Sequence, residues 1–163
     1  YHWETINRKV GECINEAVAL DCMSCIVALA FSVEALINFV GSRSVQEWKE
    51  RRAFAEKITL VTRTLGMHYD EAVEPYQTVA ILKQIRDQIA HGQPIEKSVH
   101  ISSTASLNEA MEAPWDGFLT PAFCNRAYTR VNEFGHTLIG CSGIPIEQTI
   151  TSAFPEIAAD REV

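Results

Sequence analysis

The stretch Cys22–Val40, CMSCIVALAFSVEALINFV, decides the fold because it is an almost continuous apolar run. The run is long enough in principle to span a bilayer. Glu34 and Asn38 interrupt it, and a carboxylate at the centre of a bilayer costs at least about 2.5 kcal/mol. No other stretch of the chain is comparably apolar, and the mean hydropathy of the whole chain is near zero. We therefore expect a buried central helix of a helical bundle and no membrane span.

Apolar residues recur at helical spacing on both sides of this run and predict further helices. The predicted helices cover residues 3–18, 21–40, 44–65, about 76–91, and 121 to about 142. Asp21 is expected to cap the central helix and Gly41 to end it. Thr120 suits the N-cap of the last helix, and Gly140 or Gly143 suits its end.

These elements predict an all-α protein, an up-and-down helical bundle of four to five helices. We expect one domain over residues 1–163, with its core at about 20–142 and a C-terminal tail at 143–163. A short extended segment is expected near 98–103, followed by a short helix at about 104–113.

Composition places the chain among globular proteins. It has 163 residues, 47% of them hydrophobic, and a formal net charge of −7. This excludes collagen-like and disordered classes and argues against coating duplex nucleic acid by charge alone. Five cysteines are an odd number and too sparse for a secreted disulfide scaffold, and Tyr1–Gly11 carries no signal-peptide pattern. We therefore expect a cytoplasmic protein.

One segment of this acidic chain is electropositive. Residues 41–64 hold six basic and three acidic side chains. A solvated helix face with Glu–Arg pairs would explain this balance, and so would a surface that meets a polyanion.

The sharpest motif is Arg86-Asp87, three further residues, and His91, with Gly92 directly after it. A guanidinium binds phosphate oxygens with a planar fork, and a histidine moves protons near neutral pH. The two side chains diverge on a regular helix and can converge only if His91 lies where the helix ends. A surface arginine and a histidine at the helix C-terminus would form the same pattern with no catalytic role.

This motif on the fourth predicted helix, preceded by an apolar helix that carries Glu34 and Asn38, resembles the HEPN superfamily of helical bundles. The resemblance covers roughly residues 20–100. It implies a metal-independent endoribonuclease that acts as a homodimer, with two motifs facing each other across the two-fold axis. The RNA 2′-hydroxyl would be the nucleophile, His91 the general base or acid, and Arg86 the group that stabilises the charge on the phosphate.

Further residues follow from the resemblance. Asp87 and Glu34 join the expected catalytic set, with Glu34 orienting Arg86 or His91. Arg51 and Arg52 of the electropositive segment and Lys83 of the fourth helix are expected to bind RNA. Glu34 and Asn38 share one helix face, so they could equally be structural residues that bond across the bundle.

Two other functions remain open. A catalytically silent HEPN-like module could act as a dimerising scaffold or as one partner of a toxin–antitoxin pair. A redox protein could use Cys22 and Cys25, a C-x-x-C pair that more often serves only as packing on a buried helix. No residue spacing indicates a metal site or a nucleotide cofactor, so none is expected.

Overall fold

A computed structural model describes residues 1–92, 110–145 and 148–149, and these residues form helices, turns and links without a strand. The predicted all-α helical bundle is confirmed. The extended segment expected near 98–103 and most of the short helix expected near 104–113 lie outside the described residues. The described elements are α1 (His2–Gly11), α2 (Val18–Ser44), α3 (Phe54–Thr64), α4 (Tyr76–Ala90), the short 3-10 helix η1 (Asp116–Phe118) and α6 (Pro121–Ser142).

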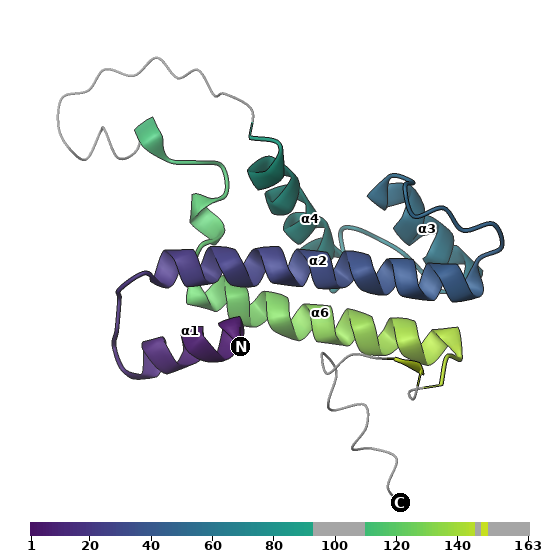
Figure 1. The fold of residues 1–163 in the computed structure, drawn as a ribbon, viewed down its shortest axis with the longest axis horizontal. Helices are drawn as coiled ribbons and strands as arrows, with labels where there is room; N and C mark the ends of the chain where they lie inside the picture. Colours follow the sequence, from purple (N-terminus) through teal and green to yellow (C-terminus); the bar gives the residue numbers. More distant parts are fainter. Residues whose placement is uncertain (93–109, 146–147, 150–163) are drawn as a thin grey trace, which may run out of the picture.

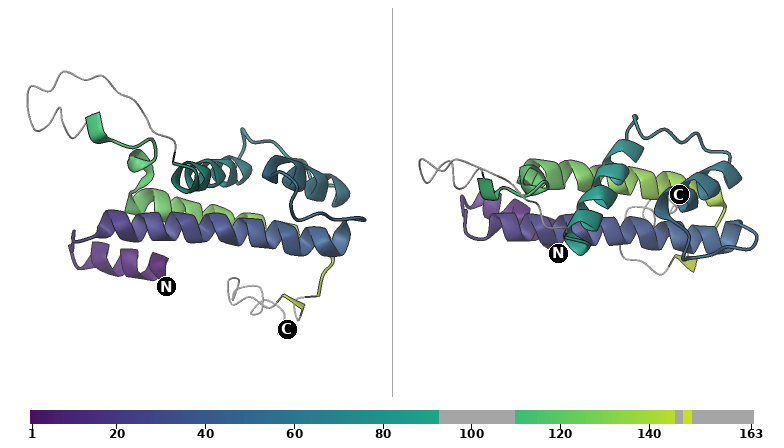
Figure 2. Two further views of the ribbon diagram at one scale, coloured as in Figure 1. Left: turned by 45° about the horizontal axis from the view of Figure 1, so that its top comes forward. Right: turned by 90° about the horizontal axis from the view of Figure 1, so that it is seen from above.

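The helix α2 is the centre of the bundle and contacts α1, α3, α4 and α6. It lies beside α6, and the two run in the same direction (Figure 1). Helix α1 runs back along one side of this pair, whereas α3 and α4 lie on the opposite side, with α4 crossing obliquely (Figure 2). The chain therefore reverses direction between α1 and α2, before α4, and again before α6.

The core is built on the apolar run of α2, as its sequence predicts. Cys22, Ile26, Ile37 and Val40 are fully buried, and they belong to one core cluster with apolar side chains of α6 such as Phe134. By length and composition alone, α2 is the one described helix that could cross a membrane, a test that core helices of soluble proteins also pass. Within its most apolar stretch, 39% of the helix is buried inside the bundle.

The link between α1 and α2 differs from the prediction. Helix α1 ends at Gly11, and Cys13 and Ala17 both adopt a left-handed backbone with φ of 55°. Because this breaks the helix, α2 begins at Val18 and Asp21 lies inside its first turn, so the predicted Asp21 cap is wrong. The Asp21 carboxylate instead accepts a hydrogen bond from Lys9 Nζ at 2.5 Å, which ties α1 to α2.

The end of α2 is also later than predicted. Gly41 does not end the helix, which continues to Ser44. A Cβ atom at Gly41 would lie 2.5 Å from the Trp48 indole, so the missing side chain is what allows Trp48 to pack on α2. Residues 45–53, which include Trp48, form turns, bends and links, and the helix predicted to start at 44 begins only at Phe54.

The other helix boundaries agree with the prediction. Helix α4 begins directly after Pro75 and ends at Ala90, with His91 at its C-cap. The Thr120 side chain accepts a hydrogen bond from the Phe123 N–H at 3.2 Å and caps α6, and Gly143, with φ of 65°, ends it.

Candidate functional site

Glu34, near the middle of α2, binds a cation from each of two other helices. Its Oε1 accepts a hydrogen bond from Lys57 Nζ of α3 at 2.8 Å. Its Oε2 accepts one from Arg86 Nη2 of α4 at 2.6 Å. The carboxylate thus joins three helices, and Glu34 lies beside the arginine of the motif, as expected from the sequence.

Lys57 is the most deeply buried charged residue of the described chain, with its side chain 1% exposed. Besides Glu34, its ammonium group donates to Asn38 Oδ1 at 3.1 Å and to the carbonyl oxygen of Glu50 at 3.3 Å. An ammonium group has three hydrogens to donate, so these three acceptors satisfy it fully. Asn38 therefore has the structural role that the sequence left open, because it bonds across the bundle to Lys57.

Arg86 is enclosed by partners on several sides. Its Nη1 lies 3.2 Å from Asp87 Oδ1, and its guanidinium lies over the Phe31 ring at 5.7 Å. Its side chain is only 19% exposed, and among the described residues its buried Nε has no hydrogen-bond partner. Arg86 is therefore not the surface arginine of the non-catalytic alternative, because its guanidinium lies at the edge of the core.

Asp87 also pairs with Lys83, one turn earlier on α4. We call the five residues joined by these contacts the ion-pair network. Its members are Glu34, Lys57, Lys83, Arg86 and Asp87. The network holds three cations and two carboxylates, so it carries one net positive charge. Lys83, which was expected to bind RNA, forms an ion pair with Asp87 in this structure.

His91 lies one helical turn beyond Asp87 and is exposed at the C-cap of α4. Its backbone N–H donates to the Asp87 carbonyl oxygen at 2.9 Å and closes the last turn. Within the described part of the chain, no hydrogen bond involves its imidazole or joins it to Arg86. The structure thus brings Glu34, Arg86 and Asp87 together, whereas the His91 side chain takes no part in their contacts and is exposed at the end of α4.

The two arginines expected to bind RNA lie in the turns that precede α3. Arg51 is exposed and lines a surface hollow of about 700 Å³. Arg52 is half-buried and lines a different hollow of about 450 Å³ along α3. They belong to the 45–53 turns and not to a helix, and the Glu50 carbonyl connects this segment to Lys57.

Sequence reasoning missed Lys57. A signal for it exists, because Phe54, Ile58 and Val61 mark the buried face of α3, and Lys57 falls on that face. A lysine on a buried face requires an acidic partner, and Glu34, a carboxylate in an apolar run, requires a partner of the opposite charge.

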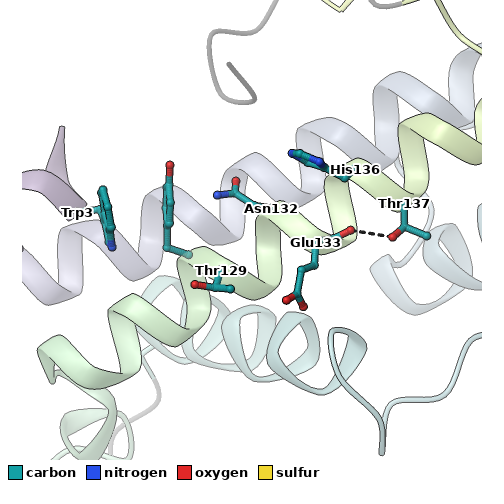
Figure 3. A pocket seen from close by; sticks show the side chains of 7 residues that line it. Trp3, Thr129, Asn132, Glu133, His136 and Thr137 are labelled. Atoms are coloured by element: carbon teal, nitrogen blue, oxygen red, sulfur yellow. Dashed lines mark hydrogen bonds between the residues drawn. The ribbon is translucent and has the colours of Figure 1, made fainter. Parts of the chain in front are cut away.

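A separate open cleft of about 500 Å³ lies between α1 and α6 and contains no member of the ion-pair network. Trp3 stands at one end of a row of α6 side chains in this cleft (Figure 3). Its ring stacks on Tyr128 at 4.5 Å between centroids, and its Nε1 donates to Asn125 Oδ1 at 2.6 Å. These contacts hold α1 against α6.

The C-x-x-C cysteines, Cys22 and Cys25, lie in the core. All five cysteines of the chain are free thiols. Cys124 of α6 donates its thiol hydrogen to the Cys22 carbonyl oxygen at 3.7 Å. A hydrogen bond from Cys124 lowers the pKa of the Cys25 thiol, whereas burial raises the pKa of Cys22. Neither thiol of the pair is exposed, so the redox function lacks the accessible thiol that it needs. Among the described residues, no group of three or more potential ligands could hold a metal ion.

Compared with protein-family models, curated protein sequences and solved structures, the chain shows no significant match.

Proposed function

We propose that this protein is a cytoplasmic, metal-independent endoribonuclease of the HEPN type that acts as a homodimer. The observation that carries the proposal is the placement of the motif. Arg86 is fixed by Glu34 in a network with one net positive charge, and His91 is exposed at the C-cap of the same helix, five residues later. The five free cysteines suit a reducing compartment.

The reaction would need only these groups and the RNA itself. The 2′-oxygen loses its proton and attacks the adjacent phosphorus, and the bond from phosphorus to the 5′-oxygen breaks. That 5′-oxygen takes up a proton, so the products are a 2′,3′-cyclic phosphate and a 5′-hydroxyl end. His91 would transfer one of these protons, and the Arg86 guanidinium would stabilise the charge on the phosphoryl oxygens.

An exposed apolar stripe on α2 supports the dimer. Its members are Leu20, Ala28, Phe31 and Ala35, which share one face of the helix. Phe31 is 55% exposed and lies under the Arg86 guanidinium, so the stripe reaches the ion-pair network. A second copy packed on this stripe would bring two motifs close together. Arg51 and Arg52 would then extend the positive surface toward the RNA backbone.

One observation favours a second function, a catalytically silent interaction module. Arg86 is 19% exposed and already binds both Glu34 and Asp87, which limits its contact with a phosphate. In that case the network is structural, and the exposed stripe on α2 would bind a second copy or a protein partner such as an antitoxin.

Cleavage assays with matched histidine variants separate the two functions. We expect His91→Ala to slow cleavage by about 10²–10⁴-fold, the usual effect of losing general acid–base assistance. His68→Ala, which removes an exposed histidine outside the network, should leave the rate unchanged. Arg86→Lys should also be slow, because a point charge replaces a bidentate fork.

The products and the conditions provide further tests. Cleavage should leave cyclic phosphate ends, persist in EDTA, and fail on RNA with a 2′-O-methyl group at the scissile position. Cleavage that survives His91→Ala, or that stops with the chelator, would contradict the mechanism. A folded wild-type protein without activity on any RNA would favour the interaction module.

A further inference from the structure

The buried lysine of α3 has no role in the proposed mechanism so far. We propose that Lys57 is a positioning residue for Arg86: by taking one oxygen of Glu34, it leaves the Arg86 guanidinium with positive charge to offer an RNA phosphate. This inference rests on the proposed function for the identity of the anion as an RNA phosphate. The link from Lys57 through Glu34 to Arg86 rests on the geometry alone.

The geometry is a carboxylate shared between two cations. Glu34 gives Oε1 to Lys57 at 2.8 Å and Oε2 to Arg86 at 2.6 Å. Because each oxygen has its own cation, the carboxylate is fixed in orientation, and Arg86 is held through a fixed partner. Without Lys57, Glu34 could rotate and place both oxygens on Arg86, as carboxylates do with guanidinium groups.

The charge balance of the ion-pair network depends on the same residue. With Lys57 the network has one net positive charge, and without it the cations and carboxylates cancel. Arg86 would then sit between two carboxylates, Glu34 and Asp87, with only Lys83 to offset them. A neutral network attracts a phosphate much less than a positive one.

Burial makes this charge effective. The Lys57 side chain is 1% exposed and has hydrogen bonds to Glu34, Asn38 and the Glu50 carbonyl. A buried charge is screened by salt much less than an exposed one. At an effective dielectric constant of about 20, a unit charge roughly 10 Å from an anion changes its affinity by about tenfold.

The test is binding of a fluorescent 2′-O-methyl RNA oligonucleotide, which cannot be cleaved, measured by anisotropy. Lys57→Met removes the charge and keeps a long apolar stem, and we expect it to weaken binding about tenfold. Lys57→Met with Glu34→Gln removes both charges and restores the net positive balance. The glutamine amide keeps one oxygen that can accept the hydrogen bond from Arg86, so the guanidinium stays in place and binding should return to within about threefold of wild type. Arg8→Met removes one exposed positive charge from α1, on the opposite side of the bundle, and should have little effect.

The outcomes separate this inference from the nuclease proposal. Equal binding by the wild type and Lys57→Met, or no recovery in the double variant, would overturn the role of Lys57. The wild type could bind the oligonucleotide and yet not cleave ordinary RNA. That result would contradict the nuclease proposal, and it would support the role of Lys57 if Lys57→Met weakens binding and the double variant restores it. No binding by the wild type would overturn both. If Lys57→Met fails to fold, the double variant decides: weak binding by it overturns the inference, and binding near the wild-type level supports it.

Discussion

Glu34→Gln removes one negative charge from the centre of the ion-pair network and hardly changes the shape of the side chain. It should destabilise the protein, because Lys57 would remain buried with only neutral acceptors. Those acceptors are Asn38 Oδ1 at 3.1 Å and the Glu50 carbonyl oxygen at 3.3 Å. The substitution therefore tests whether the network stabilises the fold as well as the site.

The magnitude follows from burial. Removing one partner of a fully buried ion pair costs about 3–5 kcal/mol. The Glu34 side chain is 27% exposed, so water partly replaces it, and we expect a loss of about 2–3 kcal/mol in the free energy of unfolding. For a chain of this length, that loss lowers Tm by roughly 5–10 °C.

Urea unfolding followed by circular dichroism measures this loss, with thermal melts as a second assay. Glu56→Gln is the matched control, because Glu56 is an exposed carboxylate on α3 one position before Lys57, and its loss should change stability by less than about 0.5 kcal/mol. In a Lys57→Met background, Glu34→Gln should lose most of its effect, because no buried ammonium remains. A Glu34→Gln protein as stable as the control would refute the reasoning.

Three other predictions concern packing, thiols and assembly. Gly41→Ala should destabilise the protein by about 1–2 kcal/mol in urea unfolding, because its Cβ would displace the Trp48 indole and overpacking outweighs the gain in helix propensity; unchanged stability would contradict that contact. In the native state, a thiol reagent should quickly modify Cys13 and Cys141, whereas the three buried cysteines should react only on unfolding; rapid reaction of all five would contradict the core packing. Phe31→Glu should convert a homodimer to a monomer in sedimentation experiments, and a dimer that survives it does not use the α2 stripe.

Much of the fold could be predicted from local sequence patterns. Some features act within a single helix and can therefore be recognised in the sequence. They are the apolar run of α2 and the caps of α6 at Thr120 and Gly143. The packing of Trp48 on Gly41, just before α3, could not be predicted, because it is a contact between two separate elements. No periodicity in residues 44–65 carries that information.

The same distinction holds for the candidate site. The resemblance implied that Glu34 orients Arg86 or His91, and the structure shows the contact with Arg86. Lys57 was missed, since its role arises only when α3 packs on α2 and the charges of three helices meet. The partial burial of Arg86 was missed for the same reason.

The position of Glu34 and Asn38 in α2 also has a consequence for synthesis of the protein. Helix α2 leaves the ribosome well before α6, because residues 45–120 must be made in between, which takes several seconds at about 5–20 residues per second. During that time α2 lacks its main covering helix, and by length and composition it matches a membrane-spanning segment. A carboxylate near the middle of the helix opposes insertion into lipid. Until Lys57 and Arg86 have been made, the Glu34 carboxylate lacks both cations that bind it in the folded protein, so its charge makes insertion of α2 into lipid costly.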